Sequence, residues 1–166
     1  GFYVARYEAG LDENKNIVFK DASVAGNKVT TTDASNSETS SWYGLYKKIK
    51  TFTTDSDKVV SSMIWGSQYD AMLNWMAKTG KTVGTSDDTK RNTTPITGGG
   101  DKTDIINNVY DLYGCYKEWT LEAASTDSRA VRGGIYSTSD SAANRDNYFP
   151  NIAFSLYSSR ATLYIK

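Results

Sequence analysis

Apolar residues recur at helical spacing in two stretches of this chain, and both stretches predict helices. The first helix can be capped by Ser40 or Ser41, and its apolar positions are Trp42, Leu45, Ile49 and Phe52. The second helix is expected to begin at a Ser67 cap, with Asp70 three residues on in the capping position, and to end at Gly80. Its apolar stripe, which is typical of a core-facing helix, comprises Tyr69, Met72, Leu73 and Met76.

Shorter runs with β-branched or alternating apolar residues predict strands between long polar loops. The expected strands cover residues 2–7, 16–20, 27–31 and 59–65, and the last of them is expected to be buried. Residues 30–41, 53–57 and 82–104 are rich in Gly, Ser, Thr, Asn and Asp and are expected to form turns and loops. The pattern therefore predicts an α+β fold with two helices, short antiparallel strands and much irregular backbone.

Length and charge narrow the class of protein. With 166 residues and no linker or repeat, residues 1–166 are expected to form one domain. Lys and Arg together number 19, as do Asp and Glu, so no charge excess points to a nucleic-acid partner. No apolar run approaches the roughly 20 residues needed for membrane insertion. Since the chain starts directly in a strand-like run, we expect a processed chain or an excised domain.

The absence of histidine and the single cysteine exclude several kinds of catalytic and metal site. The chain has no histidine, which excludes Ser-His and Cys-His catalysis, and its one cysteine, Cys115, excludes an internal disulfide or a multi-cysteine zinc site. The triplet Gly98-Gly99-Gly100 lacks the G-K-[ST] that a phosphate-binding loop requires. Asn92 begins an N-x-T sequon, which matters only in a eukaryotic secreted protein.

Three motifs in the C-terminal half resemble the formylglycine-generating, sulfatase-modifying family, whose fold is a variant of the C-type lectin fold. The run D-L-Y-G-C-Y-K-E-W-T at 111–120 resembles the family's D-M-x-G-N-V-W-E-W-T signature. The run R-A-V-R-G-G-I-Y at 129–136 resembles its R-V-x-R-G-G-S-W corner, and S-S-R-A-T-L-Y-I at 158–165 resembles its closing G-F-R-x-x-L strand. The opening strand and the second helix also resemble bacterial and prophage members, so the similarity touches most of the chain.

The family contains both enzymes and binding proteins, and the enzymes are distinguished by cysteines at particular positions. Its enzymes oxidise a substrate cysteine with copper and oxygen, using cysteines that follow the R-G-G corner. Residues 135–157 contain no cysteine, and Cys115 stands where the family has Asn. We therefore expect no enzyme, and Cys115 is expected to be a packed small hydrophobe rather than a nucleophile.

The non-catalytic branch includes the variable proteins of diversity-generating retroelements, in which a C-terminal segment is mutated at adenines of Asn-type codons. Such codons, mutated in their first two positions, cannot yield Lys, Glu, Gln, Met or Trp. Residues 135–157 contain none of these types, although the other 143 residues contain 26. The resemblance thus implies a diversified ligand-binding segment at 135–157, and an ordinary Ser/Asn-rich loop is the alternative.

The resemblance places this segment on a solvent-facing surface that is pinned at both ends. Arg132 and Arg160 are expected to tie loops together, and Gly133 and Gly134 to form the corner. Aromatic anchors for a ligand, each of which could instead pack in the core, are Tyr136, Tyr148, Phe149, Phe154 and Tyr157. Adaptable polar contacts are Ser137, Thr138, Ser139, Asp140, Asn144, Asp146, Asn147 and Asn151. Framework positions inside the segment are Ala142, Ala143, Arg145 and Pro150, with Ile152 and Leu156 facing inward.

Family members also hold Ca²⁺ in the turn before E-W. The resemblance implies ligands from the side chains of Asp111 and Glu118 and the carbonyls of Gly114 and Tyr116, which is chemistry that a hard cation prefers. A turn without metal, in which Glu118 accepts backbone N–H groups, is the alternative.

Function follows from the same resemblance. We expect a receptor-binding or adhesion domain, displayed outside the cell on a virion or bacterial surface, whose partner is a protein or glycan on a target surface. The alternative is a non-diversified structural or adhesive domain of a phage tail or surface protein. Both a monomer and an oligomer fit this expectation.

Overall fold

The computed structural model describes residues 1–14, 16–25, 41–52, 57–99 and 103–166, and it has an α+β architecture. The helices in this part of the chain are α1 (Trp42–Lys50) and α2 (Gly66–Lys78). The strands are β1 (Tyr3–Val4), β2 (Gly10–Leu11), β3 (Ile17–Val18), β4 (Val24–Ala25), β5 (Val59–Met63), β6 (Ile105–Ile106), β7 (Val109–Tyr110), β8 (Lys117–Ala123), β9 (Arg129–Arg132), β10 (Arg145–Tyr148), β11 (Tyr157–Ser159) and β12 (Ala161–Ile165).

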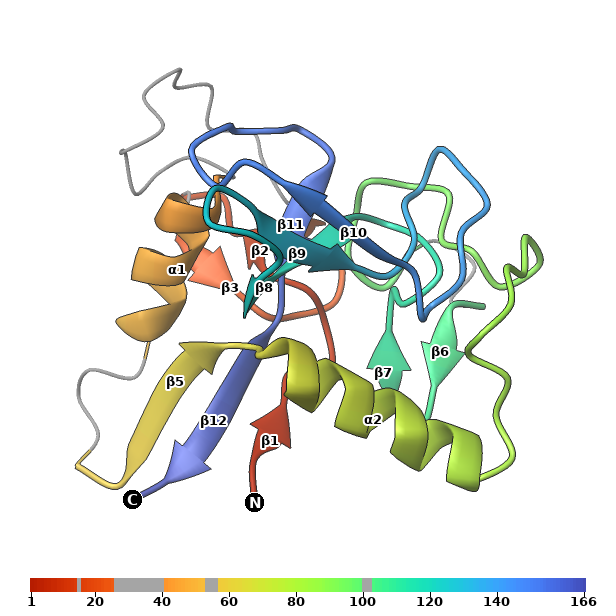
Figure 1. Cartoon of the computed structure of the whole chain (residues 1–166), viewed down its shortest axis with the longest axis horizontal. Coiled ribbons are helices and arrows are strands. Elements are labelled where there is room, and N and C mark those ends of the chain that lie inside the picture. The colour runs from red at the N-terminus through yellow and green to blue at the C-terminus, as the bar shows by residue number, and fades with distance from the viewer. Residues whose placement is uncertain (15, 26–40, 53–56, 100–102) are drawn as a thin grey trace.

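The described strands form four small sheets (Figure 1). The three-stranded sheet β1-β12-β5 brings both ends of the chain together at the lower side of Figure 1. The four-stranded sheet β10-β9-β8-β11 lies above it, and the chain crosses from one to the other where β11 ends and β12 begins. Two smaller sheets, β3-β2-β4 and β6-β7, complete the set.

The two larger apolar clusters among the described residues fill most of the interior. One lies beneath α2, where Tyr69, Met72 and Met76 pack with Leu112 and Tyr113. The other lies between α1 and the larger sheets, and its largest side chain, Trp119, is completely buried. Large rings thus supply much of the buried area, as the abundance of Tyr and Trp predicts.

Both predicted helices are present, with corrected ends. Ser41 caps α1 as expected, since its Oγ accepts from the Gly44 N–H at 3.2 Å. Helix α2 begins earlier than predicted: Trp65 is the N-cap, and its backbone N–H donates to Gln68 Oε1 at 2.8 Å. Ser67 lies inside the helix, so the predicted Ser67 cap is wrong. The physical reason is that the Gln68 amide reaches back over one turn.

The strands are shorter than predicted. The run expected at 2–7 pairs only at β1, and the run at 16–20 only at β3. In strand β5, Ser61 and Met63 are buried while Val60 is 38% exposed, so the strand expected to be buried is buried on one face only. The predicted strand at 27–31 lies outside the described residues, as do most of the loops expected at 30–41 and 53–57. Within the described residues, neither helix has the length and apolar character needed to cross a membrane.

Candidate functional site

The segment 135–157 begins at a corner that only glycine can form. Gly133 has φ +77°, and a Cβ on Gly134 would lie 1.9 Å from the Tyr113 carbonyl oxygen. The preceding Arg132 is buried, forms an ion pair with Asp70 of α2, and lies 5.1 Å from the centre of the Tyr69 ring. The predicted structural role of this corner is therefore confirmed, and it fixes the segment's start to α2.

The segment ends at an equally rigid joint. Arg160, which follows β11, is completely buried, and its guanidinium donates to both oxygens of Glu118, at 2.7 Å to Oε1 and 3.0 Å to Oε2. Its remaining N–H groups donate to the carbonyls of Ala5, Arg6 and Tyr110 at 2.8–3.0 Å. One planar side chain thus joins β8 and β12 to the N-terminal segment and to β7.

Inside the segment, the predicted framework residues mostly lie inward. Ala142 and Pro150 are buried, and the Ala143 N–H donates to the Val83 carbonyl at 3.0 Å. The backbone carbonyl of Asn144, a predicted ligand contact, accepts from the Gly133 N–H at 3.1 Å and helps to close the corner, while the residue itself is half-buried.

Strand β10 is the edge strand of its sheet, and all four of its residues are exposed. It pairs with β9 in antiparallel register, from Arg145 opposite Arg132 to Tyr148 opposite Arg129. Arg145 lies across the sheet from Glu122, with Nε 3.2 Å from its carboxylate. The backbone of β10 is therefore fixed by β9, while all four of its side chains are in contact with solvent.

An aromatic cluster supports the opposite face of this edge. Tyr148, Phe154 and Tyr157 form a triangle with ring centres 5.0–5.2 Å apart, and Tyr157 also meets Trp119 edge-to-face at 5.2 Å. Tyr157 is only 5% exposed, so its predicted role as a contact is wrong: it is the floor of the cluster, because Trp119 beneath it belongs to the core. Phe154 is half-buried above it.

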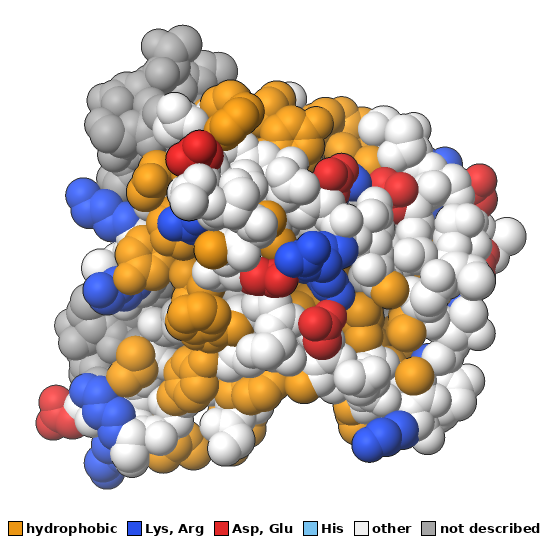
Figure 2. Space-filling view, in the orientation of Figure 1, with side chains coloured by type: hydrophobic (Ala, Val, Ile, Leu, Met, Phe, Trp, Pro, Cys, Tyr) orange, Lys and Arg blue, Asp and Glu red, His pale blue; other side chains and the backbone are white. Residues whose placement is uncertain are grey.

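The loop after β10 carries the most exposed apolar side chains of the segment. Phe149 is 54% exposed, and Ile152, predicted to face inward, is 38% exposed. The inward prediction for Ile152 is wrong because the interior below is already filled by the aromatic triangle. These two side chains help to line a pocket of about 470 Å³ that continues along Asn147, Tyr148 and Phe154 to Ser125, Asp127 and Ser128. Figure 2 shows hydrophobic side chains along this upper edge of the molecule.

Sequence reasoning missed two parts of this surface. The Ser-Thr-Asp-Ser turn between β8 and β9 lines the pocket, although it had no signal beyond its polarity. Lys117 Nζ lies 3.4 Å from the Asp140 carboxylate and 3.5 Å from the Asp146 carboxylate, so it forms ion pairs with two predicted contact residues. Four further predicted contact residues of the segment are exposed, namely Ser137, Thr138, Ser139 and Asn151.

Tyr136 lies between framework and surface. Its backbone N–H donates to the Cys115 carbonyl at 2.9 Å and its carbonyl accepts from Arg91. The half-buried ring meets Tyr116 edge-to-face at 5.8 Å. Only one side of the ring therefore remains for a ligand.

The turn before E-W is a network of buried polar side chains. Asn92 is 2% exposed; its Nδ2 donates to Asp111 Oδ1 at 2.8 Å, and its Oδ1 accepts from the Thr94 N–H at 3.0 Å. A glycan on Asn92 would displace these contacts, so the sequon does not fit modification of the folded protein. Asp104 accepts from the backbone of Leu112 and Tyr113, yet burial raises its pKa to about 7.

The residues implied as calcium ligands lie in this turn, but their oxygens have other partners. Asp111 accepts from Asn92 and from the Gly98 N–H at 2.8 Å, and burial raises its pKa to about 6. Both oxygens of Glu118 accept from Arg160. A cation at both carboxylates would compete with a guanidinium, so the two side chains do not fit a shared calcium site with the carbonyls of Gly114 and Tyr116. No group of three or more Cys, Asp and Glu side chains in the described ranges is arranged to hold a metal.

Cys115 is completely buried in the same network. Burial and the neighbouring carboxyl of Glu8 raise the pKa of its thiol well above the usual value. A buried thiol with a raised pKa is a poor nucleophile at neutral pH.

Comparisons with protein-family models, curated proteins and solved structures find no match to this chain. Functional inference therefore rests on the geometry of the segment.

Proposed function

We propose that this protein is a non-catalytic binding domain with a C-type lectin-like fold, and that residues 135–157 form its ligand surface. The observation that carries the proposal is the contrast between β10 and its supports. All four β10 side chains are exposed, while Arg132 and Arg160 at the two ends of the segment are buried in hydrogen-bonded joints. Such a surface can change its sequence at little cost to the fold.

The chemistry of the surface suits recognition of a macromolecule. Exposed rings at Tyr148 and Phe149 offer large apolar contacts with few rotatable bonds, and Asn147, Asp146 and Asn151 add short polar groups. This combination is typical of paratopes, in which aromatic anchors supply contact area and small polar residues adapt hydrogen bonds. A protein or glycan on a target surface is the partner we propose, with display on a virion or bacterial cell.

Diversification by a retroelement is part of the same proposal. It is supported by the absence of Lys, Glu, Gln, Met and Trp from residues 135–157. The encoding locus tests it directly: we expect a near-copy of the gene's 3′ end beside a reverse transcriptase, with differences confined to template adenines. A locus without such a repeat would leave a fixed adhesive or structural domain as the function.

Binding itself has a separate test. The protein with Tyr148→Ala and Phe149→Ala should lose at least about tenfold in affinity for a target selected on the wild-type surface, since aromatic anchors dominate interfaces. The matched control is Phe52→Ala, which removes a ring of similar exposure that does not line the pocket beside Tyr148 and Phe149. Equal losses in both variants would contradict the assignment of the surface.

A further inference from the structure

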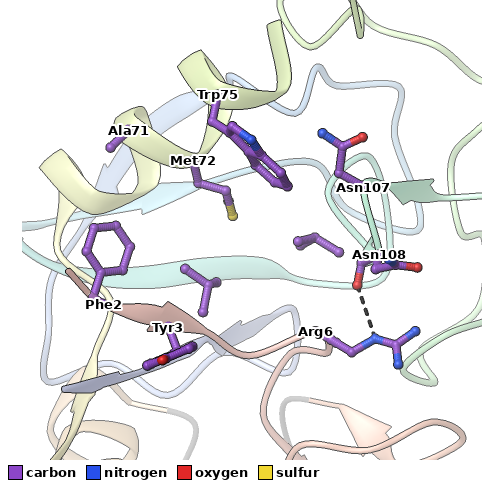
Figure 3. Close-up of a pocket in the computed structure, with 10 residues that line it drawn as sticks. Phe2, Tyr3, Arg6, Ala71, Met72, Trp75, Asn107 and Asn108 are labelled. Atoms are coloured by element: carbon purple, nitrogen blue, oxygen red, sulfur yellow. Dashed lines mark hydrogen bonds between the residues drawn. The ribbon is translucent and has the colours of Figure 1, made fainter. Parts of the chain in front are cut away.

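A groove lies between β1 and α2, at the lower side of the molecule in Figure 1 and away from the loop that follows β10 (Figures 1 and 3). Its volume is about 410 Å³, which is in the range of ligand sites, and the outline in Figure 2 is hollowed there. Its walls come from Phe2 and Val4 on one side and Met72 and Trp75 on the other.

The strand that forms one wall has an open backbone edge. The Ala5 N–H donates to the Ala161 carbonyl at 2.9 Å, so Ala5 is in a hydrogen-bonded pair with β12. Because such pairs alternate along an antiparallel ladder, the N–H and C=O of Val4 point away from β12. The hairpin that contains β7 lies on this outer edge at Arg6, and its residues Asn107 and Asn108 line the groove together with Val4, so the outer edge of β1 borders the groove. Within the described residues, neither group has a hydrogen-bond partner.

The neighbouring hairpin covers this edge only in part. The Tyr110 N–H of β7 donates to the Arg6 carbonyl at 2.8 Å, which extends the outer edge at that residue. The hairpin then turns back at Asn107 and Asn108, whose φ angles of +49° and +65° are those of a tight two-residue turn. The edge at Val4 is therefore left uncovered, directly beyond the end of the hairpin.

The groove offers an apolar anchor site beside this edge. Met72 is 5% exposed and forms part of the core cluster against which Val4 packs. Trp75 is 50% exposed, and Figure 3 shows its indole extending from α2 toward the groove. An apolar side chain inserted here would cover both residues and complete their burial.

One end of the groove carries positive charge. Arg6 donates from Nε to the Asn108 carbonyl at 3.3 Å, and its guanidinium lies 5.7–5.8 Å from the centres of the Tyr7 and Tyr110 rings. These contacts hold the cation at the groove's end, and no Asp or Glu is among the described residues that line it. The groove is therefore complementary to a carboxylate.

We propose that this groove binds an extended peptide segment of a partner protein as an added strand on β1. The peptide backbone pairs with the N–H and C=O of Val4, one apolar side chain contacts Met72 and Trp75, and an acidic side chain reaches Arg6. In strand addition of this kind, main-chain hydrogen bonds supply affinity and side-chain pockets supply selectivity. The domain would then hold a partner in this groove and present its ligand surface elsewhere.

The experiment is selection of a displayed library of random linear octapeptides on the wild-type protein, followed by calorimetry with the synthesised winners. We expect alternating sequences with an apolar and an acidic residue, and new protection of the Val4 amide from hydrogen exchange on binding. Val4→Pro removes only the outward N–H, since the Val4 N–H makes no bond to β12, and should weaken binding at least about tenfold. Trp75→Ala should have a similar effect, and Arg6→Gln should abolish the preference for acidic peptides.

The matched control is Trp65→Ala, because Trp65 is 49% exposed but lies outside the groove. Melting temperatures close to that of the wild type show that each variant is folded. A selection that enriches no peptide overturns the proposal, as does binding that Trp65→Ala reduces as much as Trp75→Ala. Binding that survives Val4→Pro, without protection of the Val4 amide, overturns strand pairing.

Discussion

Arg160 Nη2 lies 2.7 Å from Oε1 of Glu118, and neither side chain is more than 1% exposed. This ion pair stands at the point where the chain leaves the four-stranded sheet and enters the strand that pairs with β1 and β5. It therefore fixes the end of the proposed ligand surface to the rest of the fold.

Arg160→Met should destabilise the protein by about 3–5 kcal/mol, because it leaves the Glu118 carboxylate buried without a counter-charge. Urea unfolding measures this loss. The control is Arg145→Gln, which breaks the exposed pair with Glu122 and should cost less than about 1 kcal/mol. Similar losses of stability in the two variants would show that the buried Arg160–Glu118 pair does not hold this part of the fold together.

Stability should fall as pH rises from about 4 to about 7. Burial raises the folded-state pKa of Asp104 from 3.8 to about 7 and that of Asp111 to about 6. The folded protein therefore keeps these two carboxyls protonated to a higher pH than the unfolded chain does. The resulting contribution to the free energy of unfolding is lost as the pH rises through the folded-state pKa values.

For Asp104 this effect amounts to at most about 4 kcal/mol, since one pKa unit corresponds to about 1.4 kcal/mol. Urea midpoints at pH 5 and pH 8 measure it, and Asp57→Asn, at an exposed carboxylate, serves as the control for general charge effects. Higher stability at pH 8 than at pH 5 would contradict this. It would mean that the backbone N–H groups that donate to Asp104 stabilise its ionised form more than burial destabilises it.

Cys115 should react with a thiol reagent only when the protein unfolds. Its side chain is buried and burial raises its pKa, so access and thiolate formation are both opposed in the folded state. Labelling with a chromogenic disulfide in native buffer should be at least about a hundredfold slower than in denaturant, following the population of open molecules. Fast labelling of the native protein, or copper-dependent oxygen consumption with a cysteine peptide, would revive an oxidase function.

Calcium should change the melting temperature by less than about 1 °C, because the oxygens of Glu118 and Asp111 already accept hydrogen bonds. Differential scanning calorimetry with millimolar calcium, and with chelator in its place, measures this. A calcium-dependent rise of several degrees would instead restore the metal site that the family resemblance implies.

The helical spacing of apolar residues and the capping residues were sufficient to predict both helices, because apolar stripes and polar helix ends are local features of the sequence. Glycine chemistry likewise predicted the corner at Gly133 and Gly134. The α2 start was missed because Gln68 caps Trp65 through a long side chain, whereas the sequence offered the more usual Ser67. Strand lengths were overestimated because strand pairing depends on partners that are distant in sequence. Strand β1, for example, pairs with β12 near the other end of the chain, and only Tyr3 and Val4 take part.

The candidate surface was predicted as a segment but not residue by residue. The sequence around an aromatic residue in a polar loop does not indicate whether its ring faces the core or the solvent. Tyr157 is drawn inward by Trp119, and Ile152 is forced outward because that space is filled. The roles of Lys117 and Asn92 depend on residues far away in sequence, and no local pattern reports them.

The central claim is that residues 135–157 form a binding surface that varies without loss of the fold. Its most direct test is selection from a library randomised at exposed surface positions, which are Ser137, Ser139, Asp146, Asn147, Phe149 and Asn151. A matched library randomises equally many exposed positions of α1 and α2 that lie outside the β1–α2 groove, which are Tyr43, Lys47, Ser67, Asn74, Ala77 and Lys78. The measurement is the affinity of clones selected against a panel of unrelated proteins and glycans, after protease treatment has removed unfolded clones. We predict that both libraries stay largely folded and that binders of micromolar affinity or better, about 8 kcal/mol, come from the first library alone. Binders in equal number from both libraries, or wholesale unfolding of the first, would contradict the claim.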